Sequence, residues 1–115
     1  MLEKITYYKT ESGRSPVAEF IEALEEHEKK KAAAYITKLE MLGHNLRRPV
    51  ADYLDDGIYE LRPKGNRIFF FFFFRNTAVL VHAIKKKSDK VPAGDLLLSI
   101  TRKNEFIGKH GNGGI

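Results

Sequence analysis

The sequence predicts a small α+β domain in which an antiparallel sheet packs on a helical hairpin, with the element order β-α-α-β-β-β-α. Three observations support this prediction. Two segments between residues 15 and 42 repeat apolar residues at helical spacing, and three segments between residues 58 and 84 have the composition of consecutive strands. The length of 115 residues suits one domain with a single modest core. We place that domain at residues 1–107 and expect residues 108–115 to be a flexible glycine-rich tail.

The N-terminal half supplies one strand and both helices of the hairpin. A short strand is predicted at residues 4–9. We expect the first helix to begin at Ser15 and Pro16. Serine accepts a hydrogen bond from a free amide of the first turn, and proline loses no hydrogen bond at the first helical position, where its missing N–H would be unpaired in any case. The second helix is expected from Glu28 to Leu42, and Gly43 ends it. The apolar faces of the two helices consist of Val17, Phe20, Ile21 and Leu24, and of Ala32, Tyr35, Ile36, Leu39 and Leu42.

The C-terminal half is predicted to supply a turn region, the central strand of the sheet and a final helix. Residues 44–57 have the composition of turns, and we expect irregular structure there. The middle strand carries six consecutive phenylalanines, Phe69 to Phe74, so both of its faces are apolar and it must be central. The helical hairpin covers one face. A final helix is predicted from Pro92 to about Phe106, with Leu96, Leu97 and Ile100 pointing inward.

Composition excludes several classes of function. The chain has no cysteine, its N-terminus lacks the apolar core of a signal peptide, and its longest apolar run is too short to cross a membrane. We therefore expect a cytoplasmic protein that does not bind membranes. The four histidines are scattered without ligand spacing, and neither a phosphate-binding glycine loop nor a nucleophile elbow is present. We expect no metal and no cofactor.

Positive charge is concentrated in one part of the chain. Residues 1–61 contain nine Lys and Arg against twelve Asp and Glu, whereas residues 62–90 contain eight Lys and Arg and one acid. Such a concentration attracts polyanions, although a merely solvated basic face is the alternative interpretation. Antiparallel pairing of the second and third strands of the predicted sheet would bring Arg67 next to Lys85 or Lys86. The cluster consists of Arg62, Lys64, Arg67, Lys85, Lys86, Lys87 and Lys90.

This cluster has the chemistry for RNA cleavage without a metal. In that reaction the 2′-hydroxyl attacks the neighbouring phosphate, and fixed guanidinium groups stabilise the charge that builds on the phosphoryl oxygens. A lysine crowded by other cations can share in proton transfer. Glu60 is an alternative base, unless it only forms a surface ion pair with Arg62. His82 is either an acid or base or a half-buried strand histidine.

Several motifs resemble those of one family of bacterial toxins. They are Ser15-Pro16-Val17 with Glu19-Phe20, Gly57 to Arg62, Arg67-Ile68-Phe69, and His82 to Lys87 leading to Lys90-Val91-Pro92. In this order they resemble the phage-derived, HigB-like branch of the RelE/ParE toxin superfamily, over roughly Ile5 to Phe106. The resemblance implies a RelE-like fold and a type II toxin that cuts mRNA in the ribosomal A site. It also implies a cognate helix-turn-helix antitoxin.

The resemblance also assigns residues. It implies that Arg62, Arg67 and Lys86, with Lys87 as the alternative to Lys86, occupy the family's basic catalytic positions. With Glu60 they form the predicted catalytic set, and Lys64, Lys85, Lys87 and Lys90 are predicted to bind RNA. On this interpretation Arg67→Ala is expected to abolish growth arrest without unfolding the domain. The late tyrosine or histidine of some relatives has no counterpart, since Val91 and Pro92 stand there. A weak or ribosome-dependent enzyme is therefore expected rather than a free ribonuclease.

Two other functions remain open. The protein could share the fold but act only by binding, as the gyrase-poisoning relatives do, or it could be a catalytically inactive partner-binding module. The phenylalanine run bears on partners, because one face of its strand lacks an obvious cover other than the C-terminal segment. We expect either a homodimer through this phenylalanine-rich sheet or an antitoxin segment over it.

Overall fold

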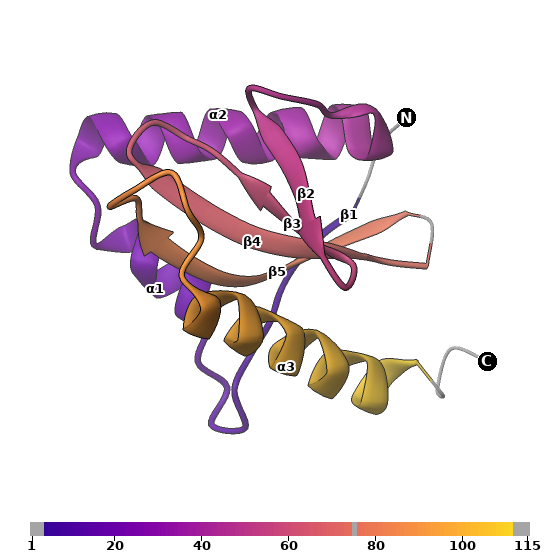
Figure 1. Cartoon of the computed structure of the whole chain (residues 1–115). Coiled ribbons are helices and arrows are strands. Elements are labelled where there is room, and N and C mark those ends of the chain that lie inside the picture. The colour runs from indigo at the N-terminus through magenta and orange to yellow at the C-terminus, as the bar shows by residue number, and fades with distance from the viewer. Residues whose placement is uncertain (1–3, 75, 112–115) are drawn as a thin grey trace.

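The computed structural model describes residues 4–74 and 76–111, and it confirms the α+β class. Three helices and five strands are found in these residues (Figure 1). In chain order they are β1 (Lys4–Tyr7), α1 (Pro16–Glu22), α2 (Glu26–Leu42), a single 3₁₀ turn at Gly43–Asn45, β2 (Ala51–Asp55), β3 (Ile58–Leu61), β4 (Asn66–Phe73), β5 (Thr77–Lys85) and α3 (Ala93–His110). None of the helices in this part of the chain is long and apolar enough to span a bilayer.

The five strands form one mixed sheet in the order β1-β5-β4-β3-β2. β1 runs parallel to β5, whereas every other neighbouring pair is antiparallel. The prediction of a purely antiparallel sheet is therefore wrong at β1. This strand pairs with β5 only after the whole helical hairpin and three further strands, and local sequence does not determine the direction of such a distant pairing.

The prediction of irregular structure over residues 44–57 is wrong at β2. β2 is an edge strand that pairs only with β3. Tyr53 and Asp55 are its exposed residues, and its register with β3 shifts between them, so the alternation of a typical strand is interrupted. Turn residues at Asp56 and Gly57, both with positive φ, connect β2 to β3.

The helical hairpin forms largely as predicted, except that Leu42, assigned to the apolar face of the second helix, is exposed. Ser15 caps α1, since its Oγ accepts a hydrogen bond from the amide of Ala18 at 3.3 Å. α2 begins at Glu26, two residues earlier than expected, and ends at Leu42 as predicted. Gly43 follows with φ 51°, a left-handed conformation that glycine adopts without a steric penalty.

The two faces of β4 pack on different helices. Ile68 and Phe70 belong to the core that includes Val17 of α1 and Leu39 of α2. Phe69 and Phe71 belong to a second core on the opposite face, against the residues Leu96, Ile100 and Phe106 of α3. α3 therefore covers the face for which we expected a homodimer or an antitoxin segment, as Figure 1 shows. A partner is not needed to bury Phe69 and Phe71.

α3 differs from its prediction in three respects. It extends to His110, past the expected end at Phe106 and through Gly108 of the predicted tail. Residues 112–115 of that tail lie outside the described part of the chain. Leu97 is 64% exposed and does not face inward. It lies one position along the helix, about 100° of rotation, from Leu96, which is partly buried and packs on the second core together with Ile100.

Candidate functional site

Five cations meet in a cleft at the edge of the sheet where β3 ends and β4 begins. The cleft has a volume of about 410 Å³. We call it the main cleft, and its lining residues are Tyr35, Arg48, Pro49, Arg62, Lys64, Gly65, Asn66, Arg67 and Lys86. Arg62, Arg67 and Lys86, which come from three separate segments, thus face one cleft.

The register of the sheet explains this meeting. Asn66 pairs with Lys85 and Arg67 with Ile84, so the start of β4 lies beside the end of β5, as antiparallel pairing predicts. The pairing continues past the strand, since the amide of Lys86 donates to the carbonyl of Gly65 at 2.9 Å. Lys86 is thereby held next to the turn that connects Arg62 to Arg67.

Arg67 forms the floor of the main cleft and is almost completely buried, with 1% of its surface exposed. Its Nη2 donates to the carbonyl oxygens of Ser88 and Asp89 at 2.7 and 2.9 Å. Its Nη1 lies 3.4 Å from Oε1 of Glu60. Arg67 therefore holds the basic loop 86–92 against the sheet, which is a structural task that the sequence did not predict for it.

Glu60 is 4% exposed and lies beneath the cleft rather than on its wall. The interpretation of Glu60 as a surface ion pair with Arg62 is wrong, because its ion-pair partner is Arg67 and it is not at the surface. Its role as a base stays a prediction. Burial raises the pKa of Glu60, more than the neighbouring Arg67 and Arg62 lower it. The ionised carboxylate is therefore held in the protein at a cost to stability.

A Glu60→Gln variant tests this consequence. A carboxyl whose pKa is raised in the folded state binds its proton more tightly there, so its stabilising effect is greatest below the ordinary pKa and falls as pH rises through the folded-state value. We expect the free energy of unfolding of the wild type to fall relative to Glu60→Gln as pH rises from about 4 to neutrality. Urea unfolding of both proteins across this range measures it. A wild-type free energy of unfolding that stays constant or rises with pH relative to that of Glu60→Gln would contradict a raised pKa for Glu60. Glu11→Gln is the control, because it makes the same substitution at an exposed site.

The remaining predicted RNA-binding residues are placed differently. Lys64 is exposed on the rim of the main cleft. Lys85 is engaged elsewhere, because its Nζ donates to Oε1 of Glu28 on α2 at 3.1 Å. The amide Nδ2 of Asn66 donates to the same oxygen at 2.9 Å, and this bond above all lowers the pKa of Glu28. Lys87 and Lys90 line a second cleft, which shares Arg67 and Lys86 with the main cleft.

His82 does not line the main cleft. Its Nε2 lies 2.7 Å from Oδ1 of Asp95 in the first turn of α3, and its ring stacks on Phe69 with centroids 5.6 Å apart. Nη1 of Arg102 lies 3.5 Å from the other ring nitrogen. Of the two interpretations left open, the structure therefore supports a half-buried strand histidine, which fixes the start of α3 to β5.

Two residues of the main cleft were missed from sequence. Tyr35 was assigned to the apolar face of its helix, but its ring also lines the cleft, with the ammonium groups of Lys31 and Lys38 5.9 and 5.4 Å from its centroid. Arg48 lies within residues 44–57, for which only irregular structure was predicted. It lines the cleft while its Nε and Nη2 donate to Oδ2 of Asp52, which lowers the pKa of that carboxyl. Its role could have been recognised only with β2 placed beside β3.

Fold and site together define a small α+β domain with a cationic cleft at one edge of its sheet. The family described as phage-derived protein Gp49-like (DUF891) matches residues 19–104. The chain therefore belongs to the phage-derived Gp49-like family, which is related to the RelE/ParE-like toxins. No curated protein matches the sequence significantly.

Proposed function

We propose that the protein is the toxin of a type II toxin–antitoxin system, of the HigB-like branch, and that it cleaves mRNA on the ribosome without a metal ion. The observation that carries this proposal is the main cleft, in which Arg62, Lys64 and Lys86 stand above the buried Arg67. Membership of a family related to RelE/ParE-like toxins supports the toxin role.

The proposed reaction uses the side chains that line the cleft. The 2′-oxygen forms a bond to phosphorus and releases its proton to water in the open cleft, while the bond from phosphorus to the 5′-oxygen breaks. Arg62 stabilises the charge on the phosphoryl oxygens through paired hydrogen bonds. Lys86, an ammonium group on the cleft wall, donates a proton to the leaving 5′-oxygen. Glu60, which lies beneath the cleft, acts by positioning Arg67.

The same relationship suggests the partners and the compartment. We assign a cognate helix-turn-helix antitoxin and ribosome-bound mRNA as partners, and the cytoplasm as the site of action. An antitoxin partner fits a family related to toxins of this type. The net charge of +5 suits a nucleic-acid substrate.

Induction in cells tests the proposal. Wild-type protein is expressed from a regulated promoter, mRNA 5′ ends are mapped, and DNA integrity is measured in the same culture. We expect growth arrest with new 5′ ends in phase with codons and intact DNA. DNA breaks with intact mRNA would instead support a binding-only toxin of the gyrase-inhibitor type. If neither mRNA cleavage nor DNA breakage occurs, the remaining interpretation is an inactive partner-binding module.

Tyr35 gives a further prediction about substrate binding. An aromatic ring on the wall of a cationic cleft can stack on an RNA base, and such stacking contributes about 1–3 kcal/mol per base. Tyr35→Ala should therefore raise KM for mRNA cleavage by roughly fivefold to a hundredfold, whereas Tyr35→Phe, which keeps the ring, should leave it near the wild-type value. Steady-state kinetics on programmed ribosomes measure this. Equal KM values for the two variants would exclude stacking by Tyr35.

A further inference from the structure

The second cleft lies next to the main cleft and has a volume of about 380 Å³. Its lining residues are Arg67, Ile84, Lys85, Lys86, Lys87, Ser88, Lys90, Pro92 and Asp95. Five of these residues are cations. The single acid among them, Asp95, is occupied by its 2.7 Å contact with His82. Three of the five cations are paired with acids outside this lining, Arg67 with Glu60, Lys85 with Glu28 and Lys86 with Asp89. Among the described residues, the unpaired positive charge of the second cleft therefore comes from Lys87 and Lys90.

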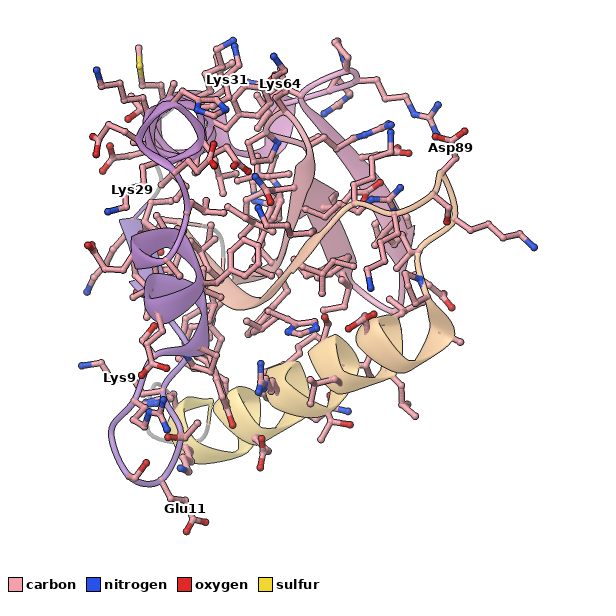
Figure 2. All side chains as sticks on the ribbon, turned by 90° about the vertical axis from the view of Figure 1, so that its left-hand side faces the viewer. Lys9, Glu11, Lys29, Lys31, Lys64 and Asp89 are labelled. Carbon is pink, nitrogen blue, oxygen red and sulfur yellow. The ribbon has the colours of Figure 1, made fainter. Side chains whose placement is uncertain are left out.

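The fold holds this cleft in place at three points. The loop 86–92 begins with the hydrogen bond from the amide of Lys86 to Gly65. In its middle, Arg67 binds the carbonyl oxygens of Ser88 and Asp89. Beyond its end, the contact between His82 and Asp95 fixes the first turn of α3. Figure 2 shows Asp89 at the outer end of this loop, with its side chain turned to solvent. Lys87 and Lys90 thus project from a backbone that is anchored on both sides.

Arg67 contributes a second, independent observation. Its Nε has no hydrogen-bond partner among the described residues, and its Nη1 has only the 3.4 Å ion pair with Glu60, although the side chain is almost fully buried. A guanidinium group has five N–H donors, and buried donors without partners require an explanation such as an absent ligand. Because Arg67 lines both clefts, an anion bound at either one could accept hydrogen bonds from it.

We propose that the second cleft binds the phosphate of the nucleotide adjacent to the scissile one, so that a single RNA strand passes from one cleft to the other across Lys86 and Arg67. This inference rests on the proposed function. A phosphate fits better than a base, because the lining contains point-charge ammonium groups and no aromatic ring. A strand fits better than free phosphate, because the two clefts share two of their cations.

Binding of a non-cleavable RNA tests the inference. A 2′-O-methyl tetranucleotide lacks the attacking hydroxyl and is titrated into ¹⁵N-labelled protein by NMR, at several salt concentrations. We expect Lys87→Gln/Lys90→Gln to bind it roughly tenfold more weakly, with a salt dependence reduced by about one to two phosphate contacts. Lys9→Gln removes a charge at an exposed site outside both clefts and should bind as the wild type does.

The outcomes separate this inference from the proposed function. Wild-type binding by the Lys87→Gln/Lys90→Gln variant would overturn the inference, even if the protein cleaves mRNA. Competition by inorganic phosphate at the same concentration as the tetranucleotide would also overturn it, because the site would then be one for free anions. In cleavage assays the double variant should raise KM far more than it lowers kcat. If the wild type cleaves nothing while tetranucleotide binding still depends on Lys87 and Lys90, the proposed function fails and the phosphate site stands.

Discussion

Replacing Arg67 with alanine is expected to destabilise the domain by about 3–5 kcal/mol, because it leaves the buried carboxylate of Glu60 without its counter-charge. The same substitution removes both hydrogen bonds that hold the carbonyl oxygens of Ser88 and Asp89. A loss of this size is a large part of the total stability of a small domain, which is typically about 5–15 kcal/mol. Urea unfolding at neutral pH measures the change.

A double-mutant cycle isolates the cause. In a Glu60→Gln background the carboxylate is absent, so Arg67→Ala should cost clearly less than it does in the wild type. The cost in the wild-type background should also shrink at acidic pH, where the raised pKa of Glu60 lets it take up a proton. An Arg67→Ala protein that unfolds at the wild-type urea concentration would show that this pair does not support the fold. Loss of activity in Arg67→Ala alone would not identify a catalytic group.

Removal of Arg62 and Lys86 from the main cleft should have the largest effect on activity. We expect the Arg62→Gln/Lys86→Gln variant to lose at least 10²- to 10³-fold in cleavage rate, the size typical for loss of one group that stabilises charge in the transition state. Stability should change little, by about 0.5 kcal/mol or less per site, because neither side chain is buried and Lys86 forms only a surface pair with Asp89. Growth arrest after induction and single-turnover cleavage measure the loss.

The matched control is Lys9→Gln. Figure 2 shows Lys9 well separated from Lys64 on the rim of the main cleft. This variant changes the net charge without changing the cleft, so it should arrest growth as the wild type does. If the folded Arg62→Gln/Lys86→Gln variant arrests growth equally well, the main cleft is not the site of action.

The position of the cleft could be predicted from the sequence because it depends on local features. The charge change at Arg62 marked the segment, and the turn at residues 63–66 indicated an antiparallel pair. Once β4 and β5 pair, the start of one must lie beside the end of the other, which brings Lys86 to the turn before Arg67. The alternation of β4 likewise separated its apolar residues between two faces, as the two cores show.

The environment of each residue could not be predicted in the same way. The burial of Arg67 depends on a loop that folds back more than twenty residues later, and its two hydrogen bonds go to backbone oxygens, which leave no pattern of residue types. The partner of His82 is thirteen residues away on α3. The direction of β1 could not be predicted either, because β1 pairs with β5, which is the last strand along the chain.

The most direct test of the central claim is single-turnover cleavage of ribosome-bound mRNA that carries one 2′-deoxynucleotide at the cut position. If the cations of the main cleft stabilise attack by the RNA's own hydroxyl, the purified protein should cut the all-ribose message in the presence of a chelator. It should leave a 2′,3′-cyclic phosphate and a 5′-hydroxyl, and it should not cut the deoxy-substituted message. Equal cutting of both messages, or no cutting of either, would contradict the account.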